Sequence, residues 1–294
     1  MEAGQLLPPF RQRDVICVDS GYGMPAKVDL YDHAYGNYEL DVYREIRLET
    51  YGEDLGQTSW VTTRESDDIP RLLELSPTST VLEIGCGSGR YALRVAEKTR
   101  CQVLGVDVNA FGVANANELA RQRNLTSLVR FEECDVSKPL PFSDHEFDAV
   151  FANDVLCHIP ERPFLFQGLL RILKPGGCFL FSDALVIGGL ISSEELAIRS
   201  SIGKYVFSPT GQNERLLTAA GFRIVGVTDT SDDAAQIAKR WHDARELRQS
   251  ALIAIEGEKD FAGLQRFLTC VYRLTFERRL LRFVYLAVKE SSSR

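Results

Sequence analysis

The stretch VLEIGCGSGRYALRVAEK, residues 81–98, is the most informative part of the chain. It opens with an apolar run that ends at Ile84, and it closes with a helical pattern. Between the two lies a turn with glycine at alternate positions, Gly85, Gly87 and Gly89. Because glycine has no side chain, a ligand can approach the backbone of such a turn closely. The stretch predicts a ligand-binding turn between a buried strand and a helix, a pattern that several classes of enzyme share.

From Thr80 onward, short apolar runs alternate with longer helical patterns. Strands this apolar are typical of a sheet that is covered on both faces, and the alternation with helices makes the sheet parallel. We therefore expect an α/β, doubly wound and mostly parallel core. Its expected strands are TVLEIG, CQVLGVDV, LVRFEECDV, FDAVFAND and CFLFSD, and its expected helices cover 89–98, 109–123 and 163–173.

After Asp183 the alternation breaks. A short helix over 193–203, a helix over 213–220 and a sixth strand, FRIVGVTD, are expected there, followed by helices over 232–255 and 259–279 and a seventh strand, LLRFVYLAV. Before the core, helices are expected over 41–50 and 63–75. The expected domains are an N-terminal arm with cover helices (1–76), the core (77–184), a lid insert (185–207) and a C-terminal part of the core (208–294) with a two-helix insertion (231–279).

Composition narrows the function. The 294 residues are 45% hydrophobic and 26% charged, as in ordinary globular proteins. The net charge of −7 argues against nucleic acid, whose phosphates attract Lys and Arg. The 7 cysteines are scattered without a CxxC pair, so neither a disulfide framework nor a zinc site is expected. No apolar run reaches the roughly 20 residues that span a bilayer, and no signal-peptide pattern opens the chain. We expect a cytoplasmic protein with no membrane partner.

Acidic residues follow the next two strands at the places where a nucleoside would need them. Asp107 ends the second apolar run, where a carboxylate can accept both hydroxyls of a ribose. Asp135 and Val136 follow the third run, where the carboxylate can accept from an adenine amino group while the valine packs on the ring. Further on, LKPGG (residues 173–177) predicts the end of a helix and a sharp turn.

These blocks, in this order, resemble the class I S-adenosylmethionine-dependent methyltransferases over residues 80–183. The resemblance implies a seven-stranded sheet with an antiparallel last strand, and S-adenosylmethionine as cofactor. It implies that Gly85 to Gly89 lie against the methionine part, that Asn153 sits beneath the sulfonium centre, and that Glu83 orders the glycine turn. The implied cofactor-binding residues are Gln57, Ser59, Trp60, Glu83, Gly85, Cys86, Gly87, Gly89, Asp107, Val108, Asn109, Asp135, Val136 and Asn153.

The N-terminal block YGEDLGQTSW, residues 51–60, resembles the cover segment of the small-molecule branch of that family. This branch includes sugar O-methyltransferases and sarcosine- or phosphoethanolamine-type N-methyltransferases. In such enzymes an N-terminal segment folds over the cofactor, so Gln57, Ser59 and Trp60 would contact it here. The alternative is that Trp60 merely anchors the arm to the core.

A transferable methyl group needs an aligned acceptor, exclusion of water and, for some acceptors, removal of a proton. His158 follows the fourth strand and Asp183 ends the fifth, so we expect His158 as general base and Asp183 as the carboxylate that orients it. Sugar O-methyltransferases of the family are similar at both places. Alternatively, His158 forms a local hydrogen bond, and an amine acceptor is methylated by positioning and desolvation without a strong base.

The expected reaction is methyl transfer to an oxygen, nitrogen or carbon atom of a small molecule. Tyr22, Tyr31, His33 and Tyr35 are the expected substrate contacts, and such rings could hold a cation, pack on an apolar acceptor or anchor the arm. The helices over 232–279 could complete the lid or form the surface of a homodimer, and we favour the lid. No carboxylate-rich cluster suggests a metal. The alternatives are a nicotinamide-dependent dehydrogenase, a non-catalytic S-adenosylmethionine-binding protein, and a methyltransferase acting on RNA or protein.

Overall fold

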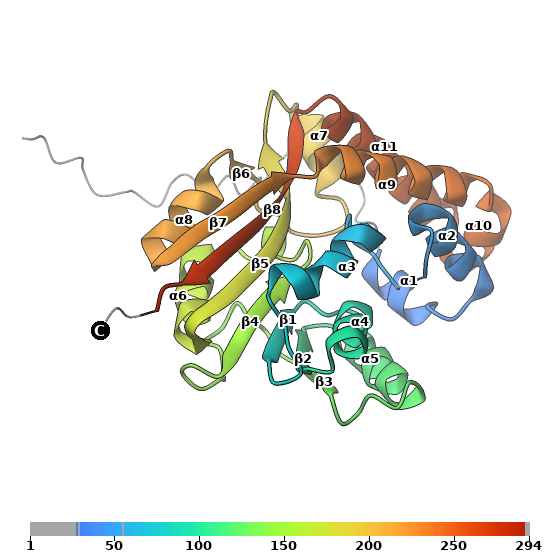
Figure 1. Cartoon of the computed structure of the whole chain (residues 1–294). Helices are drawn as coiled ribbons and strands as arrows, with labels where there is room; N and C mark the ends of the chain where they lie inside the picture. Colours follow the sequence, from blue (N-terminus) through green and yellow to red (C-terminus); the bar gives the residue numbers. More distant parts are fainter. Residues whose placement is uncertain (1–27, 29, 55, 292–294) are drawn as a thin grey trace, which may run out of the picture.

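A mixed sheet forms the centre of the molecule. The computed structural model describes residues 28, 30–54 and 56–291. The strand order is β3-β2-β1-β4-β5-β8-β7, and a short strand β6 pairs with β5 (Figure 1). The bounds are β1 Thr80–Ile84, β2 Gln102–Asp107, β3 Val129–Glu133, β4 Phe147–Ala152, β5 Leu173–Ile187, β6 Ser208–Pro209, β7 Phe222–Asp229 and β8 Leu280–Lys289.

The expected sheet is confirmed. Strands β1 to β5 pair in parallel, and β8 lies antiparallel between β5 and β7. The two-residue strand β6 was not expected from the sequence. From β1 the chain runs to β2 and β3 on one side, and it then crosses to β4 on the other side of β1. The strand order therefore reverses at β1. In open α/β sheets, ligands bind outside the carboxyl ends of the strands at such a reversal.

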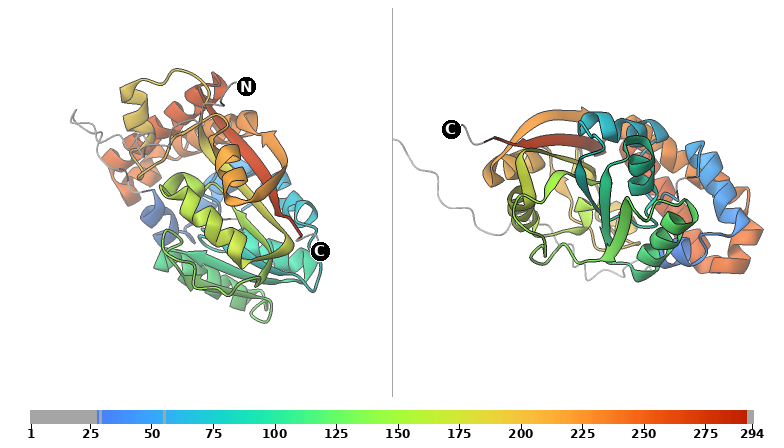
Figure 2. Two further views of the ribbon diagram at one scale, coloured as in Figure 1. Left: turned by 90° about the vertical axis from the view of Figure 1, so that its left-hand side faces the viewer. Right: turned by 60° about the horizontal axis from the view of Figure 1, so that its bottom comes forward.

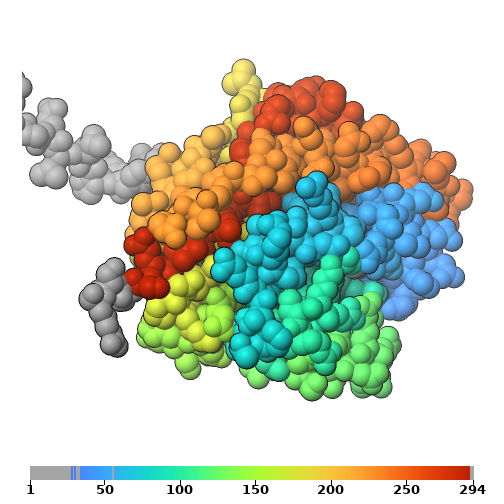
Figure 3. Space-filling model, viewed as in Figure 1, coloured from blue at the N-terminus to red at the C-terminus, as the bar shows by residue number. Residues whose placement is uncertain are grey.

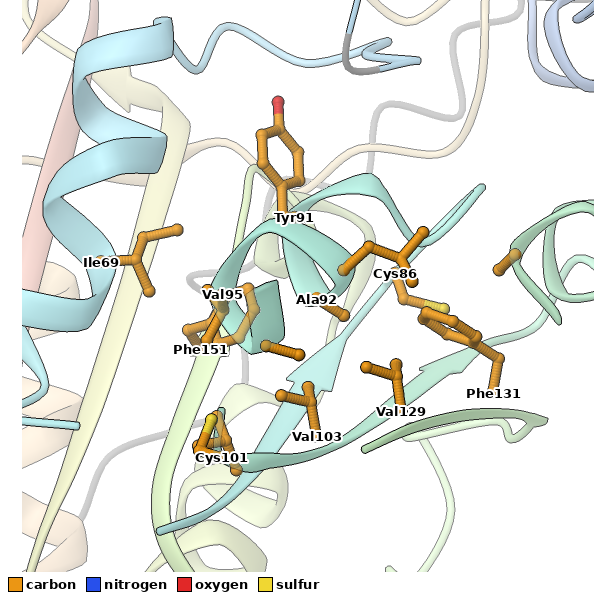
Figure 4. Packing of buried hydrophobic residues seen from close by; sticks show 14 of the residues in the cluster. Ile69, Cys86, Tyr91, Ala92, Val95, Cys101, Val103, Val129, Phe131 and Phe151 are labelled. Carbon is orange, nitrogen blue, oxygen red and sulfur yellow. The ribbon is translucent and has the colours of Figure 1, made fainter. Parts of the chain in front are cut away.

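Helices cover both faces of the sheet (Figure 2). On one face pack α3 (Thr63–Leu72), α4 (Arg90–Thr99) and α5 (Ala110–Gln122), and on the other α6 (Arg162–Ile172) and α8 (Gln212–Ala220). Successive side chains of β1 point to opposite faces of the sheet. Val81 packs in an apolar cluster on the first face, and Leu82 packs in a second cluster on the other. Figure 4 shows the first cluster, in which Ile69 of α3 points toward Val95 of α4.

The LKPGG turn forms as a bulge at the start of β5. Leu173 pairs with Phe147 and Cys178 with Ala149, so the residues between them loop out opposite a single residue of β4. Gly176 adopts φ +81°, a conformation that favours glycine. Helix α6 ends at Ile172, as the sequence predicted.

The expectation of two C-terminal helices is wrong, because there are three in this part of the chain: α9 (Ser231–Glu246), α10 (Gln249–Glu256) and α11 (Glu258–Phe276). The helix expected over 232–255 breaks at Leu247 and Arg248. The Arg248 side chain turns to α2 (Asp41–Tyr51) and pairs with Glu45 at 3.0 Å and with Glu49. Gly257, at φ +83°, then separates α10 from α11.

The C-terminal helices pack against the N-terminal ones, although they lie far apart in the chain. In Figures 1 and 3 the blue α1 (Tyr31–Gly36) and α2 adjoin the orange and red α9 to α11. Residues of α2, α9 and α11 share one apolar cluster with Trp60. In the described part of the chain, no helix combines the length and apolar character needed to cross a bilayer.

The expected lid insert, 185–207, begins too early. Strand β5 continues to Ile187, because Leu185 is buried and Val186 pairs with Leu281 of β8. The insert proper therefore follows Ile187 and contains α7 (Ser193–Arg199), which is shorter than the helix expected over 193–203.

Candidate active site

A cavity of about 930 Å³ opens at the carboxyl ends of the parallel strands, where the strand order reverses. Its wall contains residues at the ends of β1 to β4 and in the turn after β4, the segment before α3, and residues 199–205 from the end of α7 onward. Leu30, Tyr35 and Ala184 complete it. Of the fourteen residues that the family resemblance assigned to the cofactor, those lining the cavity are Ser59, Trp60, Gly85, Asp107, Val108, Asn109, Asp135, Val136 and Asn153.

The glycine turn is confirmed, but the reason given for its glycines needs correction. Gly85, Gly87 and Gly89 all have positive φ, at +69°, +50° and +77°. A Cβ on Gly87 would lie 2.6 Å from the Tyr35 hydroxyl, and one on Gly89 would lie 2.5 Å from the Phe131 ring. Protein side chains therefore already occupy the space next to these two glycines, and of the three only Gly85 lines the cavity.

Two carboxylates accept hydrogen bonds from the backbone of the turn and of the helix that follows it. Glu83 is fully buried and accepts a hydrogen bond from the Ala92 backbone N–H at 3.0 Å. Burial raises its pKa well above the usual range. Asp107 accepts from the backbone N–H of Gly87 at 2.9 Å and of Asn109 at 2.8 Å. Each carboxylate oxygen can accept twice, so Asp107 retains capacity toward the cavity.

Several residues expected at the cofactor lie outside the cavity. Glu83 and Cys86 are buried beneath the turn, and Figure 4 shows Cys86 packed beside Phe131. Gln57 is turned away: its side chain donates to the Glu53 carbonyl at 3.2 Å and lines a separate cavity of about 30 Å³.

The end of the cavity near β3 combines a charge with apolar surface. Asp135 accepts from the Ser137 hydroxyl at 2.5 Å and backbone at 3.0 Å, and these bonds lower its pKa. Lys138 lies 3.3 Å from the same carboxylate. Val136 is buried beside Asp135, whereas Val108 is 63% exposed at the rim.

Two buried polar atoms at this edge lack a hydrogen-bond partner within the residues described. They are the Glu83 oxygen Oε1, an acceptor, and the Asn153 nitrogen Nδ2, a donor. Buried groups of this kind are rarely left unsatisfied, because each one costs its desolvation energy. Asn153 lines the cavity. Glu83 does not, so of the two atoms only Asn153 Nδ2 can donate to a molecule in the cavity, where an oxygen of the amino-acid part of S-adenosylmethionine fits.

Near its end, the cover segment is joined to the core by the hydrogen bonds of Ser59 and Trp60. The hydroxyls of Ser59 and Tyr91 lie 3.0 Å apart, and the Trp60 backbone N–H donates to Asp154 at 2.8 Å. The Trp60 ring packs between Trp241 at 5.9 Å and Phe267 at 6.3 Å, measured between ring centroids. Trp60 thus both anchors the segment and lines the cavity.

Sequence reasoning missed the charge network behind this segment. Asp154 accepts from Arg282 at 2.9 Å and from Ser182 at 2.8 Å, and Arg282 also pairs with Glu65 at 2.6 Å. The network links β4, β5, β8 and α3. A signal was present, because Arg282 lies inside the apolar run LLRFVYLAV, and a charge in a buried strand needs a partner.

Asp183 does not orient His158, so that pairing is wrong. Asp183 is fully buried and does not line the cavity. It accepts from Arg162 at 2.7 Å, from the Asn213 amide at 2.9 Å and from the Leu185 backbone N–H at 3.1 Å. These three donors use both carboxylate oxygens, and His158 is not among them.

His158 does line the cavity, at the end of the 3-10 turn η1 (Leu156–His158). Its Nδ1 lies 3.2 Å from the Lys204 carbonyl oxygen, and its ring lies 4.6 Å from that of Tyr205, tilted by 33°. Burial lowers its pKa, the Lys204 hydrogen bond raises it, and the charge of Arg199 lowers it again, with a net shift below the usual 6.5.

The acceptor wall differs from the one expected. Tyr35 lines the cavity, and burial raises its pKa. Tyr22 lies outside the described residues, as do the side chains of Tyr31 and His33. Arg199 and Tyr205, which the sequence analysis did not select, stand in the same wall.

Known proteins match this fold and this chain. A family model described as a methyltransferase domain matches residues 75–217. Over 243 residues the chain is 30% identical to 27-O-demethylrifamycin SV methyltransferase of Amycolatopsis mediterranei (strain S699), covering 77% of this chain and 88% of that protein. It is 31% identical to a phosphoethanolamine N-methyltransferase of Triticum aestivum, over 72% of this chain. The chain spans 41% of the length of that wheat enzyme.

Solved structures share the fold. The [4+2]-cyclase SpnF superposes with a TM-score of 0.69 at 23% identity, covering 92% of this chain and 100% of SpnF. Phosphoethanolamine N-methyltransferase 2 of Haemonchus contortus, in complex with S-adenosyl-L-methionine, has a TM-score of 0.73 at 22% identity, over 88% of this chain and 60% of that one. The chain belongs to the class I S-adenosylmethionine-dependent methyltransferases, and its methyl donor is S-adenosylmethionine. The expected family is confirmed.

Proposed function

We propose that this enzyme methylates an oxygen or nitrogen atom of a small molecule bound in the 930 Å³ cavity. The observation that carries the proposal is that one cavity joins the cofactor motifs, such as Asp107 and Asp135, to a wall built outside the core by residues 199–205. Two relatives support a small acceptor, since their names specify 27-O-demethylrifamycin SV and phosphoethanolamine. The names of these relatives specify an oxygen in the first acceptor and transfer to nitrogen in the second.

We assign the end of the cavity near β2 and β3 to the cofactor. Asp107 would accept the ribose hydroxyls with its remaining lone pairs, and Asp135 would accept from the adenine amino group. Val136 and Val108 supply apolar surface for the adenine ring. S-adenosylmethionine, when bound, supplies an activated methyl group. Asn153 would pair its unsatisfied amide with the amino-acid part.

We assign His158 as the group that removes the acceptor's proton. A carbonyl oxygen can only accept, so Nδ1 must carry the hydrogen toward Lys204, and Nε2 is then the basic nitrogen of the neutral ring. The lowered pKa keeps the ring neutral near pH 7, the form that a base requires. The Lys204 carbonyl thereby takes the orienting role that the sequence had suggested for Asp183.

We further propose that the residues before β1 act as a cover and that the C-terminal helices complete a lid rather than a dimer surface. The packing of Trp60 between Trp241 and Phe267 supports both assignments, because Trp60 lines the cavity and the C-terminal helices hold its ring in place. A lid here would keep water away from the reacting atoms.

The test is a labelling experiment. The protein is incubated with methyl-labelled S-adenosylmethionine and a metabolite extract, and separately with 27-O-demethylrifamycin SV and phosphoethanolamine. We expect label in small molecules and none with an Asp107→Ala variant. Label in RNA or protein contradicts the proposal. So does absence of label when calorimetry shows that S-adenosylhomocysteine, the demethylated cofactor, binds.

A further inference from the structure

We infer that the methyl acceptor carries an anionic oxygen group and that Arg199 binds it. The inference rests on the proposed function, because it names the chemistry of the molecule that fills the acceptor end of the same cavity. It starts from the position of one side chain. Arg199, the last residue of α7, lines the cavity and is 1% exposed.

The guanidinium of Arg199 has no counterion in the part of the chain that the structure describes. Its Nε and Nη1 atoms are buried without a hydrogen-bond partner. Arginine stays charged at any physiological pH, so it cannot reduce the cost of burial by losing its proton. A charge removed from water is stable only when it is paired. Among the described residues, the site therefore lacks a negative group that pairs with Arg199.

Three aromatic rings surround the guanidinium but leave its N–H groups unsatisfied. Its central carbon lies 4.9 Å from the ring centroids of Tyr205 and Phe267 and 5.9 Å from that of Trp60. The faces of such rings attract a cation. They also hold the planar group rigidly, which prepares it for a bidentate bond to a carboxylate or phosphate.

Three carboxylates of the described residues near Arg199 pair with other arginines. Glu195, one helical turn before Arg199, would be its natural partner on α7. Instead, Glu195 binds Arg279 at 2.8 Å and also Arg273. Elsewhere near the cavity, Asp154 pairs with Arg282 and Asp183 with Arg162. The positive charge of Arg199 is therefore left for a molecule that enters the cavity.

The surroundings of Arg199 agree with an anion. Lys204 lines the same wall. Of the carboxylates in the cavity wall, Asp154 is neutralised by Arg282, and Asp107 and Asp135 belong to the end assigned to the cofactor. The rings of His158 and Tyr205 lie 4.6 Å apart, and the guanidinium of Arg199 lies 4.9 Å from the same Tyr205 ring, which places the anion subsite beside the assigned base. An acceptor held by its anionic group at Arg199 would thus present another atom near His158.

The test uses binding rather than turnover. Protein saturated with S-adenosylhomocysteine is titrated calorimetrically with benzoate, with phenyl phosphate and with neutral benzamide, which matches benzoate in shape. We expect at least one anion to bind roughly tenfold or more tightly than benzamide, as hydrogen bonds to a charged group require. The better of the two distinguishes a carboxylate from a phosphate acceptor.

Three variants sharpen the test. Arg199→Met should remove the preference for the anion, and Arg199→Lys should keep part of it. Arg130→Met, a matched control on an exposed arginine of β3, should change nothing. Because Arg199 forms no ion pair with a described residue, Arg199→Met should melt no lower than the wild type. If Arg199→Met does not fold, two measurements still test the inference. They are the comparison of benzoate with benzamide in the wild type and the anion preference of Arg199→Lys.

The inference would be overturned if the wild type bound benzamide as tightly as it binds both anions. An unchanged anion preference in Arg199→Met would also overturn it. Loss of S-adenosylhomocysteine binding in the same variant would assign Arg199 to the cofactor's carboxylate and also refute it. Failure of the wild type to bind S-adenosylhomocysteine would instead count against the proposed function, and the two failures are therefore distinguishable.

Discussion

The carboxylate of Asp154 lies 2.9 Å from the guanidinium of Arg282, and the same carboxylate accepts the Trp60 backbone N–H at 2.8 Å. The cover segment is thus fastened to a buried ion pair rather than to a surface loop. Both partners are almost fully enclosed, with Arg282 only 1% exposed. The position of the cover over the cavity therefore depends on a charge contributed by the last strand of the sheet.

Arg282→Met should destabilise the protein strongly, because it leaves Asp154 and Glu65 without their cation. Breaking a buried pair by removing one partner costs about 3–5 kcal/mol in free energy of unfolding. Urea denaturation measures this loss. Arg278→Met is the matched control, since its pair with Asp229 is largely exposed. Such pairs contribute about 1 kcal/mol or less. Equal effects of the two substitutions would contradict the role given to Arg282.

Asp107→Asn should weaken S-adenosylhomocysteine binding while the protein stays folded. Hydrogen bonds to a charged group contribute about 1.5–3 kcal/mol, so affinity should fall roughly 10- to 100-fold. Calorimetric titration gives the dissociation constant. Asp232→Asn, a carboxylate 92% exposed on α9, should bind as the wild type does. An unchanged affinity in Asp107→Asn would show that the ribose is held elsewhere.

Gly89→Ala should fold poorly, because φ is +77° and the new Cβ would lie 2.5 Å from the Phe131 ring and 2.7 Å from the Ala116 Cβ. Gly226→Ala, in β7, meets nothing within 4 Å and should be neutral. Thermal unfolding of both variants makes the comparison. A Gly89→Ala protein as stable as Gly226→Ala would mean that the turn can rearrange at little cost.

The pKa of His158, followed by NMR titration of its ring protons, should lie below the ordinary value of 6.5. Its charged form is disfavoured by burial, so the ring is neutral above that pKa and gains a proton as the pH falls through it. If His158 is the base, kcat/KM decreases over the same acidic range, and His158→Ala loses roughly 100-fold or more in rate. A pKa above 6.5 would contradict this geometry.

Asp183→Asn tests whether Asp183 or the Lys204 carbonyl orients His158. Since Asp183 binds Arg162 and not His158, the substitution should cost stability but move the His158 pKa by less than about one unit. A directly paired carboxylate shifts a pKa by about 1–3 units. A fall of that size would restore the His158–Asp183 pair that the sequence suggested.

The sequence alone predicted the core of the sheet, and nine of the fourteen residues that it assigned to the cofactor line the cavity. There, spacing along a strand decides position, because Asp107 and Asp135 follow consecutive parallel strands that end at the same edge of the sheet. The acceptor end was not predictable in this way. His158 and Asp183 follow neighbouring strands, yet Arg162 from α6 takes the carboxylate, and nothing in strand order announces a contact across a helix.

Arg199 and the break at Arg248 show the same limit. Both depend on side chains that approach from distant segments: Phe267 and Trp60 in the first case, Glu45 and Glu49 in the second. The local sequence pattern predicts that a helix forms and which of its faces is apolar. It does not predict which arginines will pair with a carboxylate in the folded protein and which will not.

The packing of Trp60 between Trp241 and Phe267 has a consequence for biosynthesis. During translation the residues that carry Asp107 and Asp135 leave the ribosome long before Phe267 does. The aromatic contacts that hold Trp60 in the cavity wall can therefore form only after Phe267 has been synthesised. Arg282, whose charge fixes the same segment through Asp154, is synthesised later still, so the cavity takes its final form only when the last strand of the sheet is in place.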